Sequence, residues 1–568
     1  MLFPTLPNTT REFIDWPWAK MQPYYQELAD RPLSASNATE WLSDWSHLRK
    51  LVDESYARLD LGNARDTTDE EAERRYYTFL EQIYSSIRAG EQKLKEKLLA
   101  SRLQPVGFAM PLRNMQTEAD LFREANLPLM TEEDKLGSAY DKIIGAQTIQ
   151  WEGEEITLQQ LREKTQTPQR EVRERAWRLS SARQLADRET INSLWVKFMD
   201  VRRQLAANAG FDNYRSFRWQ QQLRFDYTPA DCLTFHQAIE KIAVPAASRI
   251  YAGLRQRLGV DRLRPWDLDL DLYAIQLPAI KAYITVEELI SKSAIIFQRV
   301  SPQLGRYFET MSLEGLLDLE NRKGKAPGAF CTSFAMDERP FVFMNAVGLS
   351  TDVRTMLHEC GHAFHVFERS ALPYHHQWRS GMEFNEVASM AMELLASPYL
   401  DTDQGGFFSS VDAKRSRVEH LERIILFWPY MAVVDAFQHW VYENHEAASH
   451  PGNCDRKWAD LWGRFIPDVD WSGLDEEMAT GWHRKLHINR TPFYYIEYGL
   501  AQLGAVQVWR NALEDQAGAV HQYLQALGLG GTVPLPQLYE TAGAKFAFDA
   551  DTMQSAVDLL EDKIQELV

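Results

Sequence analysis

The chain has 568 residues, of which 45% are hydrophobic and 12% aromatic, and this is enough apolar surface to build large buried cores. With 17 tryptophans and 25% charged residues it is not a disordered or low-complexity chain. The formal net charge of -18, without any strongly basic run, argues against nucleic acid as a partner.

The sequence predicts neither a secretory signal nor a membrane-spanning helix. The N-terminal stretch MLFPTLPNTTREF lacks a basic start followed by an apolar core. The longest strongly apolar stretch without charges, residues 424–434, is interrupted by Pro429 and is far shorter than the roughly twenty residues that a span needs. The four cysteines are widely spaced and form no C-x-x-C pair, so disulfides are not expected. We therefore expect a soluble cytoplasmic protein that does not bind a membrane.

Helical periodicity dominates roughly the first two hundred residues. A long amphipathic helix is expected from about Asp69, within the helix-start signal DTTDEE, to Arg102. A second helical stretch is expected to begin with Thr167 as its cap and Pro168 as its first residue, and to continue to Ala209.

Two short hairpins interrupt this helical pattern. In residues 148–158, TIQWEGEEITL, two β-prone runs flank Gly153. In residues 328–345, GAFCTSFAMDERPFVFMN, two further β-prone runs surround a polar MDER turn. His358 follows only thirteen positions after Asn345. The edge of the second hairpin therefore either binds an extended peptide through its backbone groups or has a purely structural role.

No Gly/Ser-rich or Pro-rich linker divides the chain, so its domain boundaries are soft. We expect an N-terminal helical region in residues 1–190 and a catalytic region in residues 191–568, sharing one continuous body. The predicted fold class is mainly α.

Residues 357–365 read LHECGHAFH, in which His358 and His362 stand four positions apart. On a helix these positions lie on one face one turn apart, so both imidazoles can bind a single zinc ion. The H-E-x-x-H pattern also arises by chance, and the alternative is a helix that carries two partly exposed histidines. A catalytic zinc ion takes three protein ligands and keeps a fourth position for water, so the interpretation requires a third ligand.

The next predicted helix supplies acidic candidates for that ligand. It lies within residues 380–398, where Glu383, Glu386 and Glu393 share one face among apolar neighbours. An ionised carboxylate in such surroundings is costly unless it is paired or bound to a metal. Glu386, 24 positions after His362, is the predicted third ligand. Glu393, two turns further along, can accept the other N–H of a ligating histidine.

Four more residues of metal-binding type near the motif are interpreted differently. His365 lies on the face of the two histidines and is expected in the core or beside the ligands, rather than as a fourth ligand. His375 and His376 lie in the intervening loop and are not expected to be ligands. Cys360 is rotated about 200° around the helix from His358, so it points away as a small packed residue.

Two histidines and a glutamate leave a zinc site with one positive charge, which acidifies a bound water toward a pKa of about 7. Glu359, adjacent to His358, is placed to take the proton of that water and later pass it to a leaving amine. This chemistry is peptide hydrolysis. Zinc deaminases, by contrast, normally use cysteine ligands with an H-x-E pattern that this chain lacks. One zinc ion per chain is the expected cofactor.

A tetrahedral intermediate also requires hydrogen-bond donors for its oxyanion. Residues 487–504, HINRTPFYYIEYGLAQLG, offer His487 and a helix expected to open at the Thr-Pro dipeptide. Tyr494, Tyr495 and Tyr498 have helical spacing on this helix, where tyrosines belong either to the core or to the substrate site.

Four motifs stand in order between residues 328 and 498: GAFCTSF with PFVFMN, DVRTMLHECGHAFH, FNEVAS and HINRTPFYYIEY. In these motifs the chain resembles oligoendopeptidase F and the related thimet oligopeptidase and Pz-peptidase zinc peptidases. The stretch GFDNYRSF at residues 210–217 is also similar, and the first 190 residues more loosely resemble the helical N-terminal region of the family.

The resemblance implies zinc bound by His358, His362 and Glu386. It also implies Glu359 as the catalytic acid and base, with Glu393 behind the metal ligands. The implied fold is a mostly helical body with a deep channel that admits peptides but not folded proteins, and with the small hairpin beside the active site.

The resemblance further implies that His487 and tyrosines of the following segment bind the carbonyl region of the substrate. More distant members place these tyrosines in a glycine-rich segment after the histidine, whereas this chain has RTPFYY there. Which tyrosine acts is therefore open. Tyr498 is the first candidate, followed by Tyr495 and Tyr494.

The sequence thus predicts a cytoplasmic zinc endopeptidase that hydrolyses short peptides. One alternative is a helical zinc carboxypeptidase, which can carry the same H-E-x-x-H motif and needs a positive group for the substrate's C-terminal carboxylate. The other is a peptide-binding scaffold without activity, against which the intact Glu359 and the three ligands argue. Sequence preference, length limit, activity on collagen-like peptides and oligomeric state are not predicted.

Overall fold

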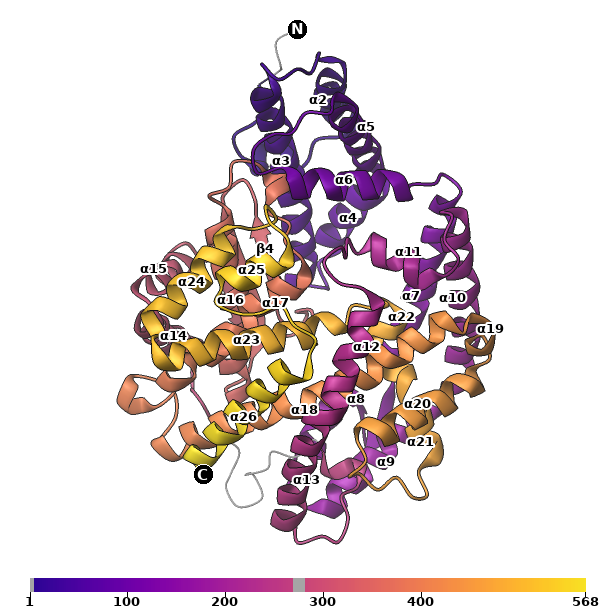
Figure 1. Ribbon diagram of the computed structural model, residues 1–568, viewed down its shortest axis with the longest axis vertical. Helices are drawn as coiled ribbons and strands as arrows, with labels where there is room; N and C mark the ends of the chain where they lie inside the picture. The colour runs from indigo at the N-terminus through magenta and orange to yellow at the C-terminus, as the bar shows by residue number, and fades with distance from the viewer. Residues whose placement is uncertain (1–4, 269–280) are drawn as a thin grey trace. The chain divides into compact units, whose positions relative to one another are not determined.

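The computed structural model describes residues 5–268 and 281–568. The protein is 71% helical, and the described residues form only two small sheets (Figure 1). The prediction of a mainly α fold is confirmed.

The chain folds into two compact units, each built from three separate stretches. The first unit comprises residues 1–120, 280–413 and 501–546, and the second comprises residues 121–279, 414–500 and 547–568. The two-domain division at residue 190 stays a prediction.

The N-terminal part of the first unit is a group of amphipathic helices. They are α1 (Thr10–Phe13), α2 (Trp18–Asp30), α3 (Ala38–Arg65), α4 (Glu70–Thr78), the π-helical turn η1 (Phe79–Tyr84), α5 (Ser85–Ser101) and α6 (Ala109–Leu121). The helix expected between Asp69 and Arg102 is confirmed, with its π-helical turn in the middle. The Asp69 side chain accepts hydrogen bonds from two backbone N–H groups of α4, and Arg102 ends α5 with a φ of 56°.

The rest of the first unit surrounds a three-stranded sheet. The strands are β3 (Leu317–Glu320), β4 (Phe330–Phe334) and β5 (Arg339–Ala346), in the order β3-β5-β4. The antiparallel pair β4 and β5 confirms the second predicted hairpin, and β3 pairs with β5 in parallel. The helices are α14 (Val286–Val300), α15 (Pro302–Leu313), α16 (Ser350–Arg369), α17 (Met382–Ala396), α24 (Gln516–Gly528) and α25 (Leu535–Thr541).

At the start of helix α16, the Asp352 side chain forms hydrogen bonds with the backbone that precedes the helix. Its Oδ2 atom accepts hydrogen bonds from the N–H groups of Val347, Gly348 and Leu349, at 2.8 to 3.0 Å, and from the Tyr283 hydroxyl at 2.6 Å. A carboxylate at a helix N-terminus satisfies N–H groups that have no partner within the helix. The start of α16, eight residues before His358, is thereby fixed.

The second unit is built mostly from helices. They are α7 (Asn126–Gly145), α8 (Leu158–Thr165), α9 (Arg170–Ala186), α10 (Arg188–Asn208), α11 (Tyr214–Gln221), α12 (Pro229–Ala238), α13 (Val244–Leu258), α19 (His445–Ala448), α20 (Pro451–Phe465), α21 (Asp475–Ala479), α22 (Leu486–Asn489) and α26 (Ala550–Leu567). Two long helices include residues of both units, α18 (Ser410–Glu443) and α23 (Ile496–Glu514). Strands β1 (Thr148–Trp151) and β2 (Glu154–Thr157) confirm the first predicted hairpin.

Short 3-10 and π turns complete the described elements. They are η2 (Ile239–Ala243), η3 (Pro265–Asp267), η4 (His375–Gln377), η5 (Ser397–Tyr399), η6 (Thr402–Gln404) and η7 (Thr480–Arg484).

The helical stretch expected from Thr167 to Ala209 differs from the prediction. It consists of α9 and α10, which meet at Asp187, and α9 begins only at Arg170. The Asp187 carboxylate accepts hydrogen bonds from Arg183, at 2.7 Å, and from Gln147, at 2.8 Å. Gln147, which comes from another part of the second unit, thus stabilises the break between α9 and α10. Helical periodicity does not indicate this break.

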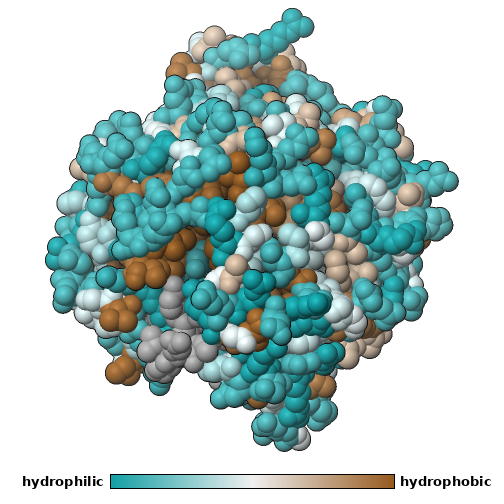
Figure 2. All heavy atoms as spheres, turned by 60° about the horizontal axis from the view of Figure 1, so that its bottom comes forward, coloured by the Kyte–Doolittle hydropathy of each residue, from teal (hydrophilic) through white to brown (hydrophobic). Residues whose placement is uncertain are grey.

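Helix α18 contains the apolar stretch noted in the sequence. In the part of the chain that the structure describes, it is the one helix with the length and composition to cross a membrane, and 72% of its most apolar window is buried inside the protein. Such burial is typical of a core helix. Hydrophilic side chains predominate on the face shown in Figure 2, and the hydrophobic ones gather in smaller patches.

Candidate active site

Helices α16 and α17 bring the three predicted zinc ligands together within the first unit. His358 and His362 lie on one face of α16, with ring centroids 5.0 Å apart. The Oε2 atom of Glu386, on α17, lies 3.6 Å from Nε2 of His358 and 3.7 Å from Nε2 of His362. One donor atom from each residue lies within 4.8 Å of the other two.

The close approach of the two helices depends on Gly361. A Cβ atom at this position would lie 2.5 Å from the carbonyl oxygen of Ala388 and 2.6 Å from Cα of Ser389. Since both are backbone atoms of α17, only glycine fits here without moving one helix. The glycine within the H-E-x-x-H motif thus sets the separation between the histidines and Glu386.

A carboxylate behind His358 orients its ring. Glu393 Oε1, on α17, lies 2.8 Å from Nδ1 of His358. A carboxylate accepts the Nδ1 proton, so Nε2, which lies toward Glu386, is the nitrogen left to bind a metal ion. Ser389 Oγ donates to Glu386 Oε2 at 3.0 Å and holds that carboxylate in turn. This is the position that the sequence predicts for Glu393.

The three donors fit a zinc ion. Donor atoms bound to one zinc ion at 2.0–2.1 Å in a tetrahedron lie about 3.3 Å apart, and the two distances to Glu386 are 3.6 and 3.7 Å. Glu386 is buried, whereas the side chains of His358 and His362 are 26% and 23% exposed. The cluster therefore has an open side, as a catalytic zinc site requires.

Charge around the cluster favours a cation. Burial opposes protonation of His358, but the hydrogen-bonded Glu393 carboxylate and the nearby Glu386 raise the pKa of His358 to about 9. Burial and the neighbouring His358 lower the pKa of His362 to about 3. Burial, assisted by the two other carboxylates and opposed by His358, raises the pKa of Glu359 to about 7. Three glutamate carboxylates and two imidazoles thus lie close together in this cluster. A divalent cation stabilises such an arrangement.

The other residues near the motif are engaged in other contacts. Cys360 is buried, with Sγ 3.6 Å from the sulfur of Met356, and all four cysteines are free, which confirms the expectation of no disulfide. His365 is buried, as expected for a core residue. His375 Nε2 lies 2.8 Å from Asp53 Oδ2, and the His376 ring packs 4.1 Å from that of Trp45.

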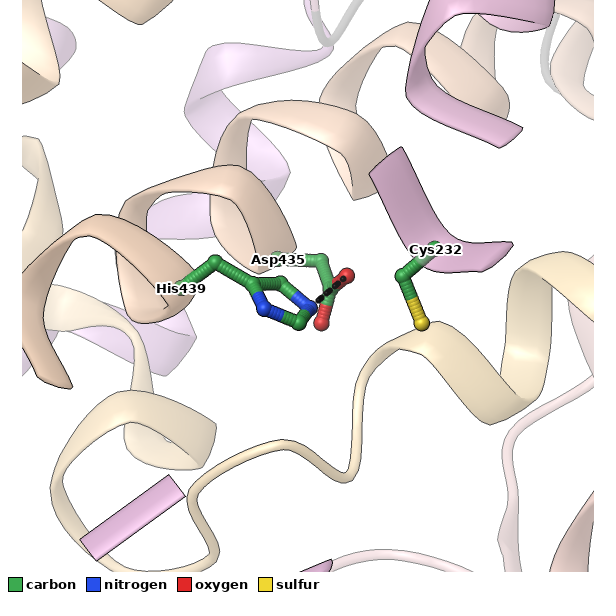
Figure 3. A group of neighbouring side chains, drawn as sticks. All are labelled: Cys232, Asp435 and His439. Atoms are coloured by element: carbon green, nitrogen blue, oxygen red, sulfur yellow. Dashed lines mark ion pairs between the residues drawn. The ribbon is translucent and has the colours of Figure 1, made fainter. Parts of the chain in front are cut away.

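A second group of donor side chains, which the sequence does not single out, lies in the second unit. Cys232, Asp435 and His439 are all buried, and one donor atom from each lies within 4.8 Å of the others (Figure 3). Cys232 is on α12, and the other two are on α18. The only signal in the sequence is the i, i+4 spacing of Asp435 and His439, and Cys232 comes from a segment about 200 positions away.

The hydrogen bonding of His439 does not fit a metal ligand. Arg215 Nη1 lies 3.3 Å from Nδ1 of His439. A guanidinium can only donate, so Nδ1 accepts and Nε2 carries the proton, 3.3 Å from Asp435 Oδ2. His236 contacts the same carboxylate oxygen at 2.9 Å. Burial would raise the pKa of Asp435, but the two histidines lower it well below its usual value, so the group is a buried ion network.

His487 and the three tyrosines lie together in the second unit. The His487 ring centroid is 5.8 Å from that of Tyr494, 5.0 Å from Tyr495 and 6.0 Å from Tyr498. The prediction of a helix opened by the Thr-Pro dipeptide is wrong, because α23 begins only at Ile496. Tyr494 and Tyr495 therefore precede the helix, and Tyr498 lies in its first turn. The roles of these residues at the zinc site stay predictions.

Comparison with known proteins identifies the family. The model of "Peptidase family M3" matches residues 164–558, which is more than half of the chain. The chain belongs to peptidase family M3. The matched range contains every predicted site residue of this protein and most of its second unit.

Individual relatives agree with this assignment. The M3 chain is 24% identical over 324 residues to oligopeptidase PepF of Bacillus subtilis, covering 54% of this chain and 46% of that protein. It is 23% identical over 272 residues to an oligoendopeptidase F homolog of Borreliella burgdorferi, covering 46% and 45%. The aligned parts thus span about half the length of these relatives. The structure of Pz peptidase A with inhibitor 2 superposes on the M3 chain with a TM-score of 0.87 and 27% identity, covering 99% of this chain and 98% of the other.

Proposed function

We propose that this M3 chain is a zinc-dependent endopeptidase that hydrolyses short peptides in the cytoplasm, with one zinc ion per chain. The observation that carries the proposal is the arrangement of His358, His362 and Glu386 at metal-ligand spacing, with the Glu393 carboxylate on Nδ1 of His358. Family membership and the relatives named as oligopeptidases support the substrate class.

In this proposal the two histidines and Glu386 hold the metal. The chemistry that a zinc ion held there would supply is acidification of water and polarisation of the carbonyl group of a peptide bond. Glu393 keeps His358 in the tautomer that can ligate, and Ser389 keeps Glu386 oriented. The open side of the cluster leaves room for water and the peptide bond.

Glu359 is the proposed proton carrier. It follows His358 directly on α16, and its side chain is buried. A general base works best when its pKa is close to the working pH, and the pKa of Glu359 is raised to about 7. Glu359 can therefore take a proton from the attacking water and donate it to the departing amine.

The substrate backbone has two proposed binding elements. Strand β4 lies at the edge of the three-stranded sheet, and both β4 and β5 pack against α16. An exposed strand edge can pair with an extended peptide. In the second unit, His487, Tyr498 and Tyr495 are the proposed donors to the carbonyl oxygen of the scissile bond, as the resemblance to oligoendopeptidase F implies.

Zinc analysis combined with a cleavage map tests the proposal. We expect one zinc ion per chain by elemental analysis, and internal cleavage of short peptides in a mixed library followed by mass spectrometry. Matched peptides with amidated C-termini are expected to be cut as well as free ones. A protein without zinc, or one that cleaves only peptides with a free C-terminal carboxylate, contradicts the proposal.

A further inference from the structure

The segment that carries the three tyrosines contains a backbone bend that needs support. Tyr494 and Tyr495 lie between this bend and α23. The bend is at Phe493, the residue directly before them, which has a φ of 66°. This left-handed region is unfavourable for a residue with a Cβ atom, and such a conformation persists only where the surrounding structure holds it.

The ring of Phe493 is one anchor of the bend. It is fully buried, with ring centroids of Trp219, His439 and Tyr442 at 5.9, 5.3 and 5.4 Å. Figure 3 shows His439 beside Asp435 on α18, with Nε2 of the ring 3.3 Å from Asp435 Oδ2. The buried ion network therefore forms one wall of the pocket that receives Phe493.

Side chains also hold the peptide groups of the bend. The N–H of Phe493 donates to Gln438 Oε1 at 2.7 Å. The carbonyl oxygen of Pro492 accepts from Gln222 Nε2 at 3.0 Å and from Arg218 Nε at 3.3 Å. These contacts fix the chain up to the bend, but not the two tyrosines that follow it.

Arg224 connects the two ends of the tyrosine segment. Its Nη2 group donates to the carbonyl oxygen of Phe493 and, at 2.6 Å, to Glu497 Oε1. Tyr494 and Tyr495 lie between these two acceptors, and Tyr498 follows Glu497 directly. Arg224 and Glu497 are both buried, at 4% exposure each. A buried guanidinium that donates to both acceptors limits how far the segment between them can move.

We propose that Arg224 is a positioning residue for peptide hydrolysis, which holds Tyr494, Tyr495 and Tyr498 in the arrangement that binds the substrate carbonyl. This inference rests on the proposed role of the tyrosines in substrate binding. Arg224 has no contact with the reacting atoms in this proposal, and it acts through the tyrosines alone.

The alternative is a buried ion pair that stabilises the second unit and nothing else. The variant Arg224→Lys separates the two, because lysine keeps the buried positive charge but replaces the rigid, planar guanidinium, whose Nη2 group holds both acceptors, with a flexible ammonium group. Arg173→Lys is the matched control. Arg173 is also fully buried in the second unit, and it donates to the Asp267 carboxylate at 2.9 Å and to the carbonyl oxygen of Trp266 at 3.1 Å.

Both variants are purified with zinc, and kcat and KM are measured on one short peptide. We expect Arg224→Lys to retain its zinc and to lose roughly 10- to 100-fold in kcat, the scale of loss when a reacting group is displaced by about 1 Å. Arg173→Lys is expected to keep kcat close to the wild-type value. Equal losses of kcat in the two variants overturn the proposal. Should Arg224→Lys not fold, Glu497→Gln, which weakens the same connection from its other end, takes its place.

Tyrosine double variants test whether Arg224 acts through the phenols. Tyr495→Phe, Tyr498→Phe and Tyr494→Phe are each combined with Arg224→Lys. If Arg224 acts through a tyrosine, its substitution costs little more kcat once that phenol is gone, so the losses are not additive. Additive losses overturn the positioning role and leave the tyrosines in place. Tyrosine variants that all keep wild-type kcat instead contradict the proposed role of the tyrosines themselves.

Discussion

The group that contacts Nδ1 of a histidine decides whether Nε2 can bind a metal ion, and this protein contains both cases. A carboxylate, Glu393, contacts Nδ1 of His358 and accepts its proton, so Nε2 is the nitrogen left to bind a metal ion. A guanidinium, Arg215, contacts Nδ1 of His439, so Nε2 carries the proton. Two clusters with similar donor spacing therefore have different chemistry, and the groups behind the ligands of the first one favour zinc.

The third ligand is tested by replacing Glu386. We expect Glu386→Gln to lose most of its zinc, because a neutral amide replaces the anionic ligand while the side-chain shape is kept. Zinc content of the purified variant is the measurement, with wild-type protein prepared in parallel. If the variant has full zinc content, the third ligand is another acidic residue of α17, and Glu383 is the first candidate.

Replacement of Glu359 is expected to separate metal binding from chemistry. Glu359→Gln should retain one zinc ion per chain while kcat falls by roughly 10²- to 10⁴-fold, the contribution of a well-placed general acid and base. The amide preserves the size of the side chain but cannot accept the proton of the attacking water. Zinc content and kcat are measured on the same preparation, and near-normal turnover with full zinc rules out Glu359 as the proton carrier.

His483 gives the second unit a predictable dependence of stability on pH. Burial, assisted by Arg188 and Arg484, lowers the pKa of His483 to about 3. Below the unfolded pKa of about 6.5, the unfolded chain therefore binds a proton that the folded chain does not, and the folded state loses up to about 1.4 kcal/mol per pH unit. This loss continues as the pH falls toward the folded value.

The variant His483→Asn isolates this contribution. We expect the free energy of unfolding of the wild type, relative to the variant, to fall by about 2 kcal/mol between pH 7.5 and pH 5. Urea unfolding of both proteins at the two pH values is the measurement, in which contributions common to both cancel. A difference independent of pH means that His483 binds its proton equally well in the folded and unfolded states.

At the scale of single elements, the contact between α16 and α17 depends on Gly361. In Gly361→Ala the new Cβ atom meets backbone atoms of α17 at 2.5 and 2.6 Å, so the helices must move apart. We expect a loss of about 1–3 kcal/mol in stability and weaker zinc binding, because Glu386 moves with α17. Thermal unfolding and zinc titration of the variant check both effects.

Gly62 provides the matched control for this substitution. It also lies inside a helix of the first unit, α3, but a Cβ atom added there would have no other atom within 4 Å. Gly62→Ala should therefore stabilise the protein by roughly 0.5–1 kcal/mol and leave zinc binding unchanged. If both variants behave alike, the spacing between α16 and α17 does not depend on the glycine.

The elements that sequence predicts well are those whose determinants are local. The i, i+4 histidines, the acidic face of α17 and both hairpins follow from residues within one element or from neighbouring ones. The start of α23 could not be predicted in this way, because the bend at Phe493 is held by Gln438 and Arg224, which are distant in the chain. The break at Asp187 likewise depends on Gln147. In both cases tertiary hydrogen bonds outweigh helical periodicity.

At the scale of the whole molecule, the two units are each assembled from three stretches of chain. In the first unit, for example, residues 1–120 cluster with residues 501–546. The candidate ligands His358, His362 and Glu386 all belong to the first unit, and His487 with the tyrosines belongs to the second. The proposed zinc ligands and the proposed donors to the carbonyl oxygen thus belong to different units.

This separation predicts where zinc stabilises the protein. A ligand that binds only the folded state adds about 4 kcal/mol at a concentration 1,000 times its Kd, and here it acts on the unit that holds the ligands. When zinc is added to the metal-free protein, we expect amide hydrogen exchange to slow in α16 and α17. Exchange in α10 and α20 of the second unit should change little, provided that each unit unfolds independently of the other.

Glu386→Gln serves as the control for this experiment, because zinc should slow exchange in neither unit of that variant. Hydrogen exchange followed by mass spectrometry of peptide fragments locates the effect in the chain. Equal protection of α10 and α20 in the wild type would show that both units open in one cooperative step. In that case, binding of zinc to the first unit also stabilises the bend at Phe493 in the second unit.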